Sequence, residues 1–170
     1  MTDLSRQARL FEAAAVVALV LLALNLLRLI GVVPLAFGVA EALGAGDPSA
    51  AWPAAEAFLI AAVSLLPTII YIGGVDSARK MFRRIGAGEL FTEANSKSLA
   101  DIGAALGYGA LAAMVIVPWL QSWIGGEHGF GGVRIEGETL VIAVIGGALL
   151  VLGRMLSRAR RLQSELDSII

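Results

Sequence analysis

Two ionisable residues lie inside long apolar stretches of this sequence, where a charge is costly. Arg28 lies in the apolar run 13–37, and Glu56 lies near the start of the run 52–75. A charge at the centre of a bilayer costs about 2.5–3.5 kcal/mol on insertion scales, so such residues usually have partners or a function. We expect Arg28 and Glu56 to form an intramembrane ion pair. It is either a structural pair that orients two helices or an ion or proton site.

A second group of chemical side chains lies in a glycine-rich connection. Its members are Glu127, His128, Glu136 and Glu138. Imidazole and carboxylates together could hold a divalent metal, but a glycine-rich loop offers no fixed geometry, so we expect a solvated loop and no metal site. Cysteine is absent, which excludes disulfides and thiolate chemistry. No Ser/His/Asp set is evident, so we expect no catalytic residue, no cofactor and no enzymatic activity.

Hydropathy determines the expected architecture. The chain has 170 residues, of which 58% are hydrophobic and 16% are charged. A helix needs about 20 apolar residues to cross a bilayer. We predict an all-α polytopic membrane protein, a four-transmembrane-helix bundle with cytoplasmic helix extensions, in one domain over residues 1–170. The predicted spans are 13–37, 52–75, 100–124 and 139–156.

Basic residues alternate between the two sides of these spans. The connection 76–99 contains five Lys or Arg residues, whereas 38–51 contains none and 125–138 contains one. The positive-inside rule therefore places both termini and the second connection in the cytoplasm. Three tryptophans fall at the outer ends of spans, as interfacial rings do: Trp52, Trp119 and Trp123. The net charge of −1 argues against direct nucleic-acid binding.

Local signals predict where the helices break. Pro67 should kink the second span, with Ser64 helping to satisfy freed backbone groups. The second span should continue to about Ile85, and Thr92 should cap the next helix. Gly103 and Gly107 form a close-packing motif. Tyr71 and Tyr108 are interpreted as packing residues.

Two features form predicted docking surfaces. The basic run contains Arg79, Lys80, Arg83 and Arg84, and it suits anionic lipid headgroups or an acidic partner, or else only signals topology. The last helix, of about 30 residues, should project from the membrane as a helical tail over 157–170. It carries a heptad seam of Leu152, Met155, Ala159, Leu162, Leu166 and Ile169, of which Leu162, Leu166 and Ile169 are the docking candidates.

A recognisable order of residues runs through the second connection. It is Met81-Phe82-Arg83-Arg84-Ile85, then Gly88-Glu89-Leu90-Phe91-Thr92, then Asn95, Leu99 and Ile102-Gly103. With four spans and the ending 159–167, the chain resembles a bacterial family of four-span membrane proteins, domain of unknown function 2975. The family's closing helix commonly ends in Thr-Ile, where this chain has Ser168–Ile169–Ile170.

The resemblance implies a place in the bacterial cytoplasmic (inner) membrane and a partner. Members of this family look like genomic neighbours of a small Xre-type transcriptional regulator. We therefore expect a non-enzymatic docking protein that binds such a cytoplasmic protein. An accessory subunit of a larger membrane complex is the alternative. A small oligomeric transporter or channel is the third reading, and it is suggested by the polar residues Arg28, Glu56 and Asn25 and by kinks at Pro67 and Pro118.

Overall fold

The computed structural model describes residues 2–30, 51–90, 92–126 and 132–167, and every element in them is helical. The helices are α1 (Thr2–Ile30), α3 (Ala51–Ser64), α4 (Leu66–Gly86), α5 (Glu93–Leu111), the π-helix η2 (Ala112–Ile116), α6 (Val117–Ile124) and α7 (Gly137–Asp167). Four helical segments are long and apolar enough to cross a membrane: Arg6–Leu27, Ala55–Gly86, Glu93–Ile124 and Gly137–Gln163. This confirms the prediction of an all-α polytopic membrane protein.

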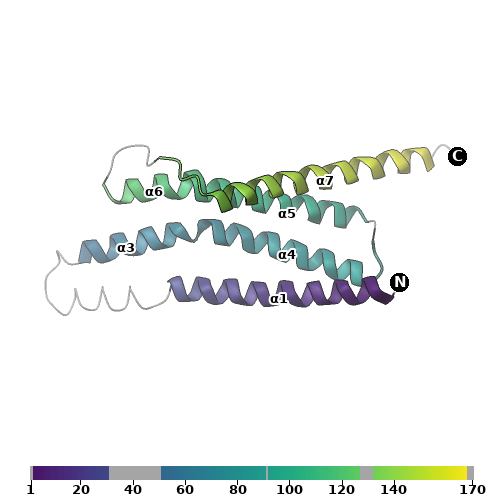
Figure 1. The fold of residues 1–170 in the computed structure, drawn as a ribbon, viewed down its shortest axis with the longest axis horizontal. Coiled ribbons are helices and arrows are strands. Elements are labelled where there is room, and N and C mark those ends of the chain that lie inside the picture. Colours follow the sequence, from purple (N-terminus) through teal and green to yellow (C-terminus); the bar gives the residue numbers. More distant parts are fainter. Residues whose placement is uncertain (1, 31–50, 91, 127–131, 168–170) are drawn as a thin grey trace.

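The helices lie side by side in the order α1, α4, α5, α7 (Figure 1). The strongest packing joins α5 to α7, followed by α4 to α5 and α1 to α4. The start of α1, the end of α7, the end of α4 and the start of α5 lie at one end of the molecule, which we call the connector end. The start of α3 and the end of α6 lie at the opposite end.

The outer faces of the helices are apolar. Only 6% of the α1 window and 11% of the α7 window is buried inside the chain. Large side chains such as Leu24 and Val144 are more than half exposed, whereas several buried residues are small or polar. A soluble domain has large apolar side chains inside and polar ones outside, and this chain has the reverse arrangement. Lipid hydrocarbon is the solvent in which an apolar outer surface is stable.

Glycines bring α5 and α7 into backbone contact. A Cβ on Gly146 would lie 2.6 Å from Gly107 N and 2.9 Å from Gly103 O. A Cβ on Gly153 would lie 2.5 Å from Ala100 N. Small residues allow such an approach, and dispersion between the backbones then holds the helices together in lipid. The predicted packing role is confirmed for Gly103, where a Cβ would press on Leu150 N, but not for Gly107, where a Cβ would meet nothing within 4 Å.

Ring contacts join the other helix pairs. The ring of Tyr71 on α4 covers Gly109 on α5, which confirms Tyr71 as a packing residue. The rings of Phe11 on α1 and Phe82 on α4 stack with centroids 5.4 Å apart. Tyr108 is 66% exposed, so its interpretation as a packing residue is wrong.

Both prolines inside spans mark departures from the α-helix. The second span breaks between α3 and α4, just before Pro67, and Leu65 N donates instead to Ala62 O at 3.1 Å. Ser64 Oγ donates to Ile60 O at 2.8 Å. The π-helix η2 ends two residues before Pro118, and Val117 N donates to Ala112 O, five residues back. The predicted break at Pro67 is confirmed.

Candidate functional site

The connector end begins with a tight turn after α4. Gly88 has φ +92°, a left-handed conformation that glycine adopts without steric cost. Glu89 N donates to Arg84 O at 3.0 Å, and this bond closes the turn. The helix α4 ends at Gly86, as the sequence predicted to within one residue.

The start of α5 is capped and locked to this turn. Thr92 Oγ1 accepts a hydrogen bond of 3.2 Å from Asn95 N, which confirms the predicted cap. Asn95 is 7% exposed, and its Nδ2 donates to the carbonyls of Glu89 and Leu90. A buried amide that binds two loop carbonyls holds the connector in one conformation. The residues that carried the family resemblance thus build a rigid turn.

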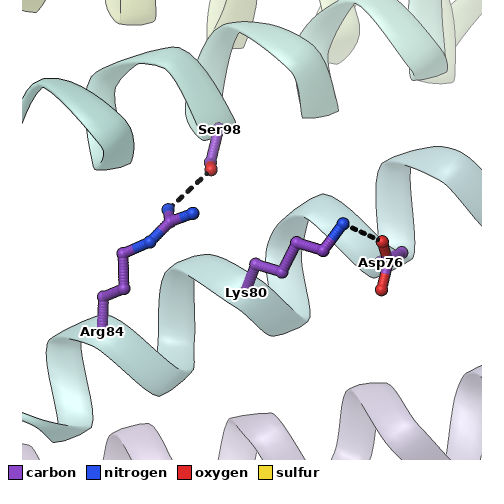
Figure 2. Close-up of polar contacts among 4 residues, drawn as sticks. All are labelled: Asp76, Lys80, Arg84 and Ser98. Carbon is purple, nitrogen blue, oxygen red and sulfur yellow. Dashed lines mark hydrogen bonds and ion pairs between the residues drawn. The ribbon is translucent and has the colours of Figure 1, made fainter.

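Arg84 joins the end of α4 to α5. Its Nη1 donates to Ser98 Oγ at 3.0 Å (Figure 2). The same nitrogen donates to Ala94 O at 3.2 Å and lies 3.5 Å from Asn95 Oδ1. Hydrogen bonds from a charged donor are stronger than neutral ones. Arg84, one of the four cations of the basic run, therefore has a structural role, which the sequence did not reveal.

The other three cations of the run differ from one another. Lys80 Nζ lies 2.6 Å from Asp76 Oδ2 on the same face of α4 (Figure 2). Arg79 is half-buried, and its Nε is buried without a hydrogen-bond partner. Arg83 is exposed. The run is therefore not one uniform basic face, and Arg83 is the member most open to a partner or a lipid headgroup.

A groove of about 560 Å³ opens between α4, the connector, α5 and α7 at the connector end. Most of its lining is apolar, with four polar side chains among them. Its lining residues are Met81, Ile85, Leu90, Asn95, Ser96, Leu99, Leu156, Ala159, Arg160 and Gln163. Asn95 therefore both fixes the connector and forms part of the wall.

The predicted seam of α7 is divided by this groove. Ala159 faces the groove, whereas Leu152, Met155 and Leu162 are 50%, 62% and 62% exposed. The side chains of Leu166 and Ile169 lie outside the described part of the chain. The face that packs on α5 is a different one, built on Gly146 and Gly153. Apolar spacing along α7 showed an amphipathic helix but could not show which face α5 would take.

The structure does not test the expected ion pair between Arg28 and Glu56. The side chain of Arg28 lies outside the described residues. Glu56 is half-buried on α3, and a Cβ on Gly125 would lie 3.8 Å from its Oε1, so its carboxylate points toward the end of α6. The pair remains a prediction.

The glycine-rich connection is described only in its second half. Glu127 and His128 lie outside the described residues, whereas Glu136 and Glu138 are exposed. Among the residues that the structure describes, no three His, Asp or Glu side chains lie close enough to hold a metal ion.

Comparison with known proteins adds one finding. A family model described as a protein of unknown function, DUF2975, matches residues 38–170. No curated protein matches this chain, and no solved structure does. The matched range includes the connector, the groove and the whole of α7.

Proposed function

Since the chain belongs to the DUF2975 family, whose description assigns no function, we propose from the geometry of the connector end that it is a membrane-anchored docking protein for a cytoplasmic regulator. The groove between α4, α5 and α7 is the observation that carries this proposal. It lies at the end of the molecule that the positive-inside rule assigns to the cytoplasm of a bacterial inner membrane.

The shape of the groove suits an amphipathic helix. The ends of α4 and α7 and the start of α5 surround the groove, whose lining is mostly apolar. In helix-in-groove binding, such a lining receives apolar side chains at positions i, i+3, i+4 and i+7 of the partner helix. The connector is held by Asn95 and Arg84 before any partner arrives. A preformed groove lowers the entropy lost on binding.

Charge favours an acidic partner. Arg160 is the only charged residue among the described residues that line the groove, and Arg83 and Arg158 are exposed at the same end. The apolar residues Met155 and Leu162 lie exposed on α7 beside it. The family resemblance supplies the class of partner, a small Xre-type helix-turn-helix protein, which would be held at the membrane by an acidic, amphipathic helix.

The test uses the absence of cysteine in the chain. Single cysteines replace Ala159, which lines the groove, and Ala87, which is exposed at the same end but outside it. Thiol-directed crosslinking in native membranes should join A159C, and not A87C, to a soluble helix-turn-helix protein identified by mass spectrometry. The deletion of residues 157–170, which removes part of the groove wall, is tested with a cysteine at Leu90, a lining residue outside the deleted range, and it should abolish the L90C adduct without affecting membrane insertion. An adduct that persists after the deletion, or that forms equally from A87C, would refute docking in the groove.

A further inference from the structure

The segment 132–136, away from the connector end, is hydrogen-bonded to the backbone of the third span. Arg134 N donates to Met114 O, in the π-helix, at 3.0 Å. The carbonyl is open to an outside donor because Pro118, four residues later, has no N–H to offer it. The non-helical segment 132–136, which leads into α7, is thereby anchored on η2 rather than beyond the end of α6.

This anchor lies below the predicted outer surface of the membrane. Met114 precedes Ile124, the end of α6, by ten residues, or about 15 Å of helix. Trp119 and Trp123 lie between them and are 40% and 62% exposed, as expected of interfacial rings. In Figure 1, α7 begins well short of the end formed by α3 and α6. The segment 132–136 therefore descends into the level of the spans.

The four side chains 133–136 are all exposed, and two of them line a cavity. Val133 and Ile135 are 50% and 67% exposed, and Arg134 and Glu136 are the two that line the cavity. Residues two apart share a face in an extended chain. Arg134 and Glu136 therefore share the face that borders the cavity and Val133 and Ile135 share the other, an arrangement that suits water on one side and lipid on the other. Irregular backbone is tolerated at membrane depth where it lines such a water-filled cavity.

The cavity holds about 200 Å³, room for about six or seven waters at about 30 Å³ each. It is lined by Ser64, Pro67, Ala113, Val117, Gln121, Arg134, Glu136 and Thr139. Gln121 Nε2 donates to Ser64 Oγ at 2.9 Å, so this wall is held by the chain itself. The side chains of Arg134 and Glu136 have no hydrogen bond or ion pair within the described part of the chain.

We propose that this cavity is a hydrated binding site for a small zwitterionic solute of the size of glycine or alanine. A guanidinium binds a carboxylate through two parallel hydrogen bonds, and a carboxylate binds an ammonium group, so Arg134 and Glu136 supply the two charges that such a solute needs. The volume excludes drug-sized ligands, whose pockets begin at about 300 Å³. The site lies away from the docking groove, and it does not depend on the function proposed there.

The first experiment asks whether the cavity is wet. Single cysteines replace Thr139, which lines it, and Leu111, a 57% exposed residue that precedes η2. In proteoliposomes, a charged methanethiosulfonate reagent should modify T139C and leave L111C unmodified. Millimolar glycine or alanine should slow modification of T139C, and acetate or methylamine, each of which carries one charge, should slow it less. No modification of T139C would overturn the proposal, as would modification without protection by either amino acid.

The second experiment assigns the charges. In the T139C background, R134Q and E136Q should each raise the amino-acid concentration needed for half-protection by about tenfold or more. E138Q is the matched control, because Glu138 is exposed in the first turn of α7 and does not line the cavity. E138Q should leave modification of T139C unchanged, and modification that still goes to completion in R134Q and E136Q shows that the cavity persists in these two variants. Protection by acetate equal to that by alanine, or unaltered protection in E136Q, would overturn zwitterion binding.

Discussion

Arg84 Nη1 donates to Ser98 Oγ across 3.0 Å and ties the last turn of α4 to α5 (Figure 2). This bond explains why a residue in a basic juxtamembrane run is half-buried. Ser98 is 6% exposed, so loss of the Arg84 guanidinium removes the donor that its buried hydroxyl oxygen accepts from. The two helices that this bond joins form the groove at the connector end together with α7.

Replacing Arg84 with leucine should loosen the connector. We expect R84L to lower the free energy of unfolding in detergent by about 1–3 kcal/mol, since hydrogen bonds from charged groups contribute on this scale. Calorimetry or denaturant titration measures it. R83L is the control, because Arg83 is exposed, and it should change stability by less than about 0.5 kcal/mol. Equal effects of the two variants would contradict a structural role for Arg84.

Gly146 should be intolerant of any side chain. A Cβ there would press on Gly107 N and Gly103 O, which are backbone atoms that cannot move alone. We expect G146A to destabilise the protein by about 1–3 kcal/mol. G147A is the neighbouring control, because a Cβ at Gly147 meets nothing within 4 Å. That variant should be neutral or slightly more stable, since alanine favours a helix over glycine. Thermal unfolding in detergent distinguishes the two outcomes.

Restoring an N–H at position 118 should release the segment 132–136. In P118A, the new donor competes with Arg134 N for Met114 O. Hydrogen exchange at the Arg134 amide should therefore become faster by about tenfold or more, the factor that corresponds to about 1.4 kcal/mol. P53A, in the exposed first turn of α3, should leave this amide unchanged. Unaltered protection in P118A would show that the proline does not free the carbonyl.

The orientation predicted from charge is open to a direct test in cells. A cysteine at Ala87, in the exposed connector, should react only when the cytoplasm is accessible. A cysteine at Trp123, which is 62% exposed near the end of α6, should react from the outside of intact cells. The opposite labelling pattern would invert the topology and place the docking groove in the wrong compartment.

Much of the secondary structure of this fold could be predicted from the sequence alone. Apolar run length predicted four spans, Pro67 predicted a break, and Thr92 predicted the start of α5. Each signal depends on residues that are neighbours in the chain, so it can be recognised without knowledge of any distant contact. The last helix, Gly137–Asp167, has 31 residues and matches the predicted length of about 30 for the same reason.

Only the tertiary structure decided which faces meet. In lipid, every face of a span is apolar, so hydropathy cannot choose among them, and close backbone approach decides instead. Gly146 on α7 therefore faces Gly103 on α5, and the remaining faces stay open to lipid, the groove or a partner. The roles of Arg84 and Arg134 likewise depend on atoms far away in the sequence: Ser98 Oγ for the first, and the carbonyl of Met114 for the second.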